Sequence, residues 1–206
     1  MSILLTRISI ALSLIVLISS CGNNEAVDPF NPEAKALQRS ALNLYRTKPD
    51  SALAMLDKAA KIDPSFYLVH NTKAMILSSN KRYDKAVAAL HQSIAINETQ
   101  PEVFLQMGLL HDRLAEETRA KSYYSRALEG FSNRQTGGGE FTTQDAVNKA
   151  VAMFMLDQPE AIQMMKELMA DSPEDPFVQY VCNNNPMCFE GLSKVELLNQ
   201  LLDRQD

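Results

Sequence analysis

The chain has 206 residues, 46% hydrophobic and 22% charged, so its length suits one packed domain and a globally disordered chain is excluded. A formal net charge of −5 and the absence of a clustered basic face argue against nucleic acid as a partner. Seven glycines, no tryptophan and abundant alanine, leucine and methionine favour helix over strand.

The N-terminus is typical of an export signal. Residues 8–18 form an unbroken apolar-rich run behind the single cation Arg7, and such a run is too short to span a bilayer core of about 30 Å. An aliphatic residue, two serines and Cys21 follow, and the chain becomes polar at once. We therefore expect residues 1–20 to be a signal peptide. The alternative is an ordinary signal peptide, or a buried helix, with a chance cysteine.

This aliphatic-Ser-Ser-Cys stretch resembles the lipobox of bacterial lipoproteins. The resemblance implies a mature chain that starts at Cys21 and carries acyl chains such as palmitate, and two or more such chains anchor a protein stably to a membrane. In this family an aspartate after the cysteine favours the inner membrane. Gly22 stands there in this chain, so the outer membrane is expected. Residues 21–32 are polar, contain two prolines and are expected to form a flexible lipidated tether.

Residues of similar size recur at a fixed period further along the chain. The recurring sets, 34 residues apart, are Ala52, Ala86 and Ala120; Leu56, Leu90 and Tyr124; and Ala59, Ser93 and Ala127. The spacing within one repeat places its three side chains on one face of a helix. A further step of 41 residues reaches Ala161, Met165 and Leu168. The extra residues match a glycine-rich loop centred on residues 134–140.

Each of these helices is preceded by a second apolar helical segment. These partner segments are residues 32–46, 65–79, 101–115 and 142–156. Short polar turns are expected within each pair, at residues 48–50, 79–82, 116–118 and 157–159. A single hairpin leaves its apolar face uncovered, so three or more hairpins must stack to build a core.

This pattern resembles the tetratricopeptide repeat (TPR), a 34-residue helix–turn–helix with small residues at repeat positions 8, 20 and 27. The match is best in residues 101–134, where Gly108, Ala120, Tyr124 and Ala127 all fit. The resemblance implies an all-α, right-handed superhelix of about four hairpins, namely residues 33–66, 67–100, 101–134 and a degenerate 142–174. The alternative is four generic amphipathic hairpins that share a period by chance.

Residues 175–206 are expected to form a C-terminal helical cap. Its last helix, residues 193–204, begins with a capping box of Ser193 and Glu196. The side chains expected to cover the end of the stack are Leu192, Val195, Leu198, Leu201 and Leu202. Cys182 and Cys188 could form a disulfide in the oxidising environment of an exported protein, and two free thiols are the alternative.

The TPR resemblance also implies where a partner binds. In this family the first helix of each hairpin lines a concave face on which partner segments dock. The residues expected to bind a partner there are Leu68, Asn71, Met75, Glu102, Leu105, Leu109, Asp112 and Arg113. Some cytosolic members grip a peptide carboxylate with Lys, Asn and Arg. Thr72, Glu102 and Gln106 stand at the corresponding places, so this clamp is not expected. The apolar strip of Met75, Leu105 and Leu109 would suit an amphipathic helix or an extended segment.

Catalytic and metal-ligating patterns are not evident in the sequence. His70 and His111 fall at inter-helix packing positions, His91 follows on a second helix, and no metal-site spacing joins them. The glycine run at residues 137–139 lacks the Lys and Ser/Thr of a phosphate loop. We expect no cofactor and no bound metal. An envelope enzyme would require His91 or His111 to meet an acid in a cleft.

The sequence thus favours a non-enzymatic adaptor or assembly factor of the bacterial cell envelope. It would be tethered by its lipid and would bind other envelope proteins in the concave face, on the periplasmic or the outer side. The alternative is a small-ligand or glycan-binding lipoprotein, which predicts aromatic side chains that face an accessible pocket. Self-association stays open.

Overall fold

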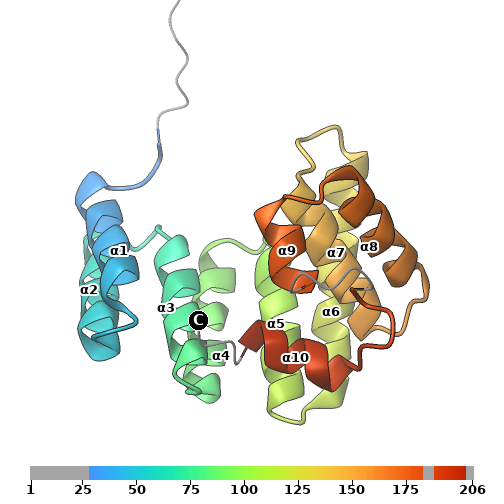
Figure 1. The fold of residues 1–206 in the computed structure, drawn as a ribbon. Helices are drawn as coiled ribbons and strands as arrows, with labels where there is room; N and C mark the ends of the chain where they lie inside the picture. Colours follow the sequence, from blue (N-terminus) through green and yellow to red (C-terminus); the bar gives the residue numbers. More distant parts are fainter. Residues whose placement is uncertain (1–27, 183–187, 203–206) are drawn as a thin grey trace, which may run out of the picture.

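The computed structural model describes residues 28–182 and 188–202, which form ten α-helices and no strand (Figure 1). The helices are α1 (Pro32–Leu44), α2 (Pro49–Ile62), α3 (Leu68–Ser79), α4 (Tyr83–Ile96), α5 (Pro101–Arg113), α6 (Glu117–Thr136), α7 (Thr143–Met155), α8 (Glu160–Asp171), α9 (Pro176–Cys182) and α10 (Lys194–Leu202). The expected signal peptide and Cys21 lie outside the described residues. None of the described helices has the length and apolar character needed to cross a membrane.

The first eight helices form four hairpins that stand side by side in chain order (Figure 1). The expected all-α solenoid is confirmed. The recurring side chains lie where the helices approach one another: the residues with 0% exposure include Ala52, Ala86, Ala120, Leu56, Leu90, Ala59, Ser93 and Ala127, and Tyr124 is 1% exposed. In the fourth hairpin Ala161 and Met165 are also fully buried. Small residues at these places let the paired helices pack closely, so the 34-residue period is a packing requirement.

The turns inside the second, third and fourth hairpins share one backbone conformation. Lys81, Ala115 and Asp157 have φ values of 58°, 58° and 60°, in the left-handed region. The next residue then donates its N–H to the carbonyl five residues back, in the pairs Arg82–Leu77 (2.8 Å), Glu116–His111 (2.8 Å) and Gln158–Met153 (3.0 Å). This is the Schellman ending, which satisfies carbonyls that a helix terminus leaves unpaired. The repeat therefore extends to the backbone of its turns.

Several expected boundaries were wrong, including the start of the first helix of the second hairpin, which is Leu68 rather than residue 65. Pro49 and Asp50 belong to α2 rather than to a turn, because proline fits the first turn of a helix, where its missing N–H is not needed. Glu117 likewise belongs to α6. The expected loop at residues 134–140 is shorter, since α6 continues to Thr136 before the three glycines end it. Gly130 does not interrupt α6, so the helix continues to Thr136 and takes up most of the extra length in this unit.

The expected tether ends earlier than residue 32. Phe30 stacks on Phe66 with ring centroids 4.5 Å apart, and it meets Tyr67 edge-on at 5.6 Å. The Asn31 N–H donates to Asp63 at 2.8 Å, and the Asn31 side chain caps α1 by accepting from the N–H groups of Glu33 and Ala34. Residues from Phe30 onward are therefore part of the folded domain. The Phe30 ring packs on the apolar surface between α2 and α3, and this contact holds the start of the domain in place.

The last two helices lie on the face formed by the first helices of the hairpins. Helix α9 packs on α7 and α8, whereas α10 turns back and crosses α5 (Figure 1). The expected burial of Val195 was wrong: its side chain is 65% exposed, and the fully buried residue of α10 is Leu197. Helix α10 therefore buries a face made by Leu197 and Leu198 against the C-terminal hairpins. The capping box is present, since Glu196 Oε2 accepts from Ser193 N at 2.8 Å.

Candidate functional site

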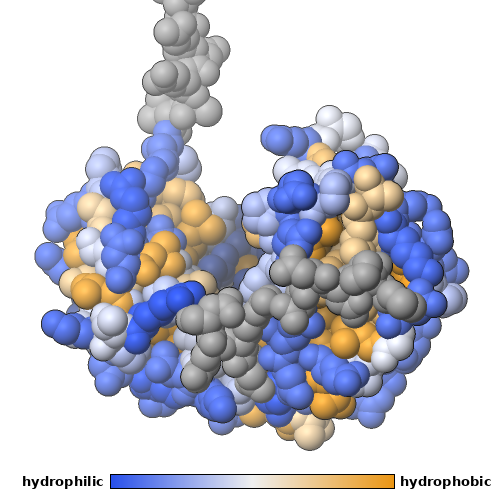
Figure 2. All heavy atoms as spheres, in the orientation of Figure 1, coloured by the Kyte–Doolittle hydropathy of each residue, from blue (hydrophilic) through white to orange (hydrophobic). Residues whose placement is uncertain are grey.

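A groove runs between the N-terminal hairpins and the C-terminal helices, on the face that Figure 2 shows hollowed. It encloses about 590 Å³, within the range of ligand and peptide pockets. Its walls come from the first helices of the hairpins (α3, α5 and α7), from the chain just after α1, and from α9 and α10. This is the concave face that the sequence analysis predicted as the binding surface.

Four of the eight residues expected to bind a partner line this groove, and four do not. Met75, Glu102, Leu105 and Leu109 border it. The other four belong to contacts inside the fold: Leu68 accepts from Gln38 through its carbonyl (3.2 Å), Asn71 donates to Gln100 (2.9 Å), Asp112 accepts from Tyr124 (2.7 Å), and Arg113 donates to Asn199 (2.9 Å). The polar edge expected from Asp112 and Arg113 is therefore committed to the protein itself.

The apolar strip of the groove differs from the expected one. Leu105 and Leu109 are only 5% and 6% exposed, so they support the floor of the groove rather than offer a docking surface. The exposed apolar area comes instead from Met75 (39%), Phe177 (41%) and Tyr180 (42%). Methionine and aromatic side chains adapt to partners of varied shape. The exposed apolar side chains of the groove therefore come from α3 and α9.

Several groove residues were missed in the sequence analysis. On α7 they are Gln144, Val147, Asn148 and Val151. They stand 42 residues after Glu102, Leu105, Gln106 and Leu109 of α5, so the repeat register, carried into the degenerate fourth hairpin, would have found them. Phe177 and Tyr180 of α9 had no such signal, because they lie beyond the last repeat.

Charged side chains beside the groove pair with one another. Glu102 accepts from Arg134 of α6 at 2.5 Å, and the same guanidinium also pairs with Asp145 of α7. The Asp145 side chain is only 6% exposed and also completes the capping box of α7 with Thr142. The hydrogen bond from Arg134 to Glu102 is the main cause that raises the pKa of Arg134. Arg134 thus ties α5, α6 and α7 together, and the charge of Glu102 is already paired with it.

A second cavity of about 440 Å³ lies on the opposite side of the hairpins, between α4 and α6, and includes His91 and His111 in its lining. His111 is buried, its ring stacks on Tyr123 at 5.1 Å, and its Nδ1 lies 2.6 Å from Glu116 Oε2. This hydrogen bond is the first cause of the lowered pKa of Glu116. A histidine and an acid do meet here, and His111 Nε2 has no hydrogen-bond partner among the described residues.

Of the other two histidines, only His70 fits the expectation of a core or half-buried side chain. His70 is half-buried and His91 is exposed. Burial is the main cause that lowers the pKa of His70, and the nearby positive charge of Lys73 adds to it. Within residues 28–182 and 188–202, no three His, Cys, Asp or Glu side chains lie close enough to hold a metal ion.

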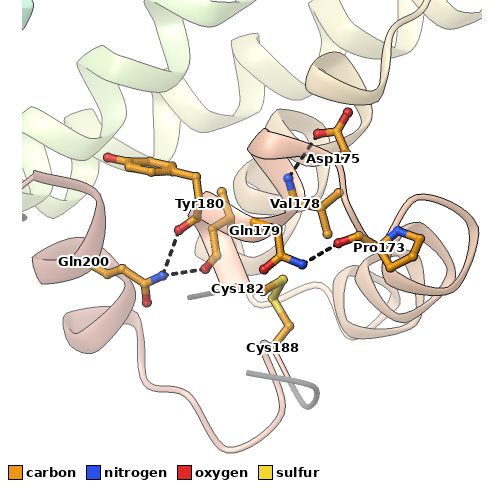
Figure 3. The surroundings of a disulfide bond; sticks show 9 residues. Pro173, Asp175, Val178, Gln179, Tyr180, Cys182, Cys188 and Gln200 are labelled. Atoms are coloured by element: carbon orange, nitrogen blue, oxygen red, sulfur yellow. Dashed lines mark hydrogen bonds between the residues drawn. A yellow bond between two sulfur atoms is a disulfide. The ribbon is translucent and has the colours of Figure 1, made fainter. Parts of the chain in front are cut away.

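A disulfide bond joins Cys182 at the end of α9 to Cys188, with Cα atoms 4.6 Å apart (Figure 3). Beside it, the Gln200 amide of α10 donates to the carbonyls of Tyr180 (3.2 Å) and Val181 (2.6 Å). Gln179 donates to the Pro173 carbonyl. The disulfide therefore joins α9 to the segment before α10, and the Gln200 hydrogen bonds connect α10 to α9, so the two helices together form one wall of the groove.

Comparison with known proteins gives the same fold. A model of the tetratricopeptide repeat matches residues 68–100, which hold α3 and α4. Among curated proteins, anaphase-promoting complex subunit 3 of Schizosaccharomyces pombe is 22% identical over 102 residues, 50% of this chain. The chain spans only 15% of that relative, so this likeness concerns a run of repeats and not the whole protein.

Two solved structures share the arrangement of helices. PilF of Pseudomonas aeruginosa has 21% identity and a TM-score of 0.50, over 71% of this chain and 64% of that one. PilW, described as a widely conserved type IV pilus biogenesis factor, has 20% identity and a TM-score of 0.56, over 85% of this chain and 80% of that one. At this level of identity the likeness shows the fold alone.

Proposed function

We propose that this TPR-containing protein is a lipid-anchored adaptor or assembly factor of the bacterial cell envelope. It binds a segment of a partner protein in the concave groove and performs no chemistry on it. The observation that carries the proposal is the groove itself, because four stacked repeats and α9 leave Met75, Phe177 and Tyr180 partly exposed around one hollow. Contiguous apolar surface that a fold leaves uncovered marks an interaction site.

The composition of the groove favours a protein segment. Its apolar centre is edged by Ser78, Ser79 and Gln144, whose side chains offer hydrogen-bond donors and acceptors. Two charged residues line the groove: Glu102 is paired with Arg134, and Arg46 is exposed at its edge and donates to the Tyr45 hydroxyl. An amphipathic helix or an extended segment fits such a surface, since apolar anchors supply affinity and polar edges supply register.

The membrane anchor is the second half of the proposal. A diacylglyceryl group and an N-acyl chain on Cys21 would hold the protein to the outer membrane, as the lipobox and Gly22 indicate. Because the domain begins by Phe30, residues 22–27 separate the anchor from Asp28, the first described residue, and they reach roughly 20 Å when extended. The domain would therefore work close to the membrane surface.

Metabolic labelling tests the anchor. Cells that express the full chain are grown with an alkyne analogue of palmitate, and the purified protein is assayed for label. The wild type should be labelled and should enter the detergent phase, whereas Cys21→Ser should do neither. Equal labelling of both would contradict the anchor at Cys21 and would leave the groove unaffected.

Site-specific crosslinking tests the groove. A photoreactive residue in place of Met75 should capture one envelope protein in living cells, and the same residue in place of Ala88, exposed on α4, should not. The adduct should disappear when Phe177→Glu is added. Capture of the same protein from both positions, or of nothing from position 75, would contradict docking in the groove. Leu105 and Leu109 are unsuitable for such tests, because a charge at either buried position of α5 would destabilise the repeats themselves.

A small-ligand or glycan-binding lipoprotein is the second candidate. The observation in its favour is that Tyr45, Phe177 and Tyr180 all line the groove, as this alternative requires. Aromatic faces bind the apolar faces of small ligands and leave polar groups to fix orientation. A thermal-shift screen with sugars and with amphipathic peptides separates the two candidates. Stabilisation by sugars alone would favour the second.

A further inference from the structure

The chain already places one of its own helices in the groove. Leu201 and Leu202, at the end of α10, line the hollow together with Met75 of α3 and Leu109 of α5. Leu202 packs against the N-terminal hydrophobic cluster, although α10 itself belongs to the C-terminal half of the chain. Helix α10 therefore extends from the C-terminal wall of the groove toward the opposite wall (Figure 1).

Helix α10 has a leucine face. Leu197, Leu198, Leu201 and Leu202 follow the spacing i, i+1, i+4 and i+5, which places all four on one side of a helix. Leu197 is fully buried and Leu198 is 8% exposed, while Val195 in the first turn of the helix is 65% exposed. A polar contact with α5 is the hydrogen bond from Arg113 to Asn199 at 2.9 Å. The groove thus accommodates an amphipathic helix with paired leucines.

Helix α10 is built to leave more easily than the helices beneath it. It has nine residues, and an isolated helix of that length is marginal in water, so its helicity depends on the groove. Its other polar ties within the described residues include an ion pair between Lys194 and Asp157 at 2.6 Å, the bonds from Gln200 to α9, and a bond from the Tyr180 hydroxyl to the Leu201 carbonyl at 3.4 Å. The side chains of Lys194 and Asp157 are 33% and 73% exposed, and an ion pair so exposed to solvent contributes little to stability.

We infer that α10 is an intramolecular occupant of the binding groove, and that the partner is an amphipathic helix whose paired leucines take the places that the leucines of α10 hold. The inference rests on the proposed function, and it adds the class of partner and the step that admits it. Displaced α10 stays attached through the polypeptide chain, and the disulfide between Cys182 and Cys188 shortens this tether, so the helix returns when the partner leaves. A tethered competitor acts at an effective concentration of about millimolar, which limits the groove to partners with a better-matched helix.

Peptide binding in trans tests the inference on the full-length chain in detergent. The probe is a fluorescein-labelled synthetic peptide of residues 192–202, titrated against the protein by fluorescence anisotropy. The opening variant is Leu197→Asp, which places a charge at the fully buried position of α10 and so releases the helix. The matched control is Val195→Asp, which introduces the same charge on the exposed side of the same helix.

The Leu197→Asp variant should bind the peptide at least about tenfold more tightly than the wild type or Val195→Asp, because its own competitor is gone. A peptide that carries the same Leu197→Asp change should not bind. Equal affinity of the two protein variants, or equal binding of the two peptides, would overturn the inference. Circular dichroism verifies that Leu197→Asp keeps the solenoid helices.

Hydrogen exchange on the wild type tests the inference even if the Leu197→Asp variant fails to fold. Amides of α10 should exchange at least about a hundredfold faster than those of α5, as expected of a segment that opens locally. Protection of α10 equal to that of α5 would overturn the inference.

Crosslinking from position 75 distinguishes the two proposals. If the adduct forms but does not increase in Leu197→Asp, α10 is not the competitor and the adaptor function remains. If peptide binds but no adduct forms, the adaptor function fails instead.

Discussion

The ring of Tyr124 lies directly over Gly108, where α5 and α6 cross. A Cβ atom on residue 108 would lie 2.4 Å from both Cδ1 and Cε1 of Tyr124, so only glycine permits this approach. Tyr124 is 1% exposed, and its hydroxyl donates to Asp112 Oδ2 at 2.7 Å, which fixes the ring in place. Burial is the main cause that raises the pKa of this hydroxyl, so it stays protonated and remains a donor.

Gly108→Ala should therefore destabilise the domain by about 2 kcal/mol, despite the better helix propensity of alanine, because overpacking displaces a fixed ring. Urea unfolding followed by circular dichroism measures the change. Gly139→Ala is the matched control, since a Cβ there meets nothing within 4 Å, and its stability should stay near that of the wild type. Equal stability of the two variants would show that Tyr124 can move aside.

Ala115→Gly should stabilise the domain by about 1 kcal/mol. Ala115 is exposed and holds a φ of 58°, a conformation that costs a residue with a Cβ about that amount and costs glycine almost nothing. Ala88→Gly, at an exposed position inside α4, should have the opposite effect by a similar amount. Thermal unfolding of both variants checks the sign, and a destabilised Ala115→Gly would refute the role of this turn.

Arg134→Met should cost about 2 kcal/mol, because it leaves the buried carboxylate of Asp145 without its counter-charge and frees Glu102. The double variant Arg134→Met with Asp145→Asn should recover part of that loss, since no uncompensated charge then remains beside α6. Denaturant unfolding of the double-mutant cycle measures the coupling. Additive losses would mean that the two side chains do not interact in solution.

Stability should fall as the pH drops below about 6.5. Burial holds the pKa of His70 below its ordinary value of 6.5, so between those two values the unfolded chain binds a proton that the folded chain does not. The stabilising contribution is complete above pH 6.5 and is lost as the pH falls toward the folded pKa. His70→Gln should show a smaller fall in melting temperature between about pH 7.5 and about pH 5.5. His91→Gln, which removes an exposed histidine, is the control, and an identical fall in both variants would rule out His70 as the cause.

Loss of the disulfide should lower the free energy of unfolding by about 2 kcal/mol, the chain-entropy effect of opening a short loop. Cys182→Ser with Cys188→Ser, compared with the oxidised wild type in thermal unfolding, measures it. The change should be concentrated in α9 and α10, which hydrogen exchange can resolve. Unchanged protection of these helices would show that packing alone holds them.

Local features of the solenoid could be predicted because each depends on residues close in the chain. The spacing of Ala120, Tyr124 and Ala127 sets one helix face, and all three are buried in the structure. The capping box at Ser193 and Glu196 likewise needs only four consecutive positions. The left-handed turn residues were not predicted, since Lys81, Ala115 and Asp157 share no side-chain chemistry, and what recurs is their backbone conformation.

The sequence by itself determined the helical repeat, because small residues at a fixed period let consecutive helices nest wherever the chain places them. Only the tertiary structure decided what the groove contains. The Arg113–Asn199 bond joins residues 86 positions apart, and no period links α10 to α5. The burial of Leu105 and Leu109 and the exposure of Val195 follow from such distant packing, which depends on the whole fold.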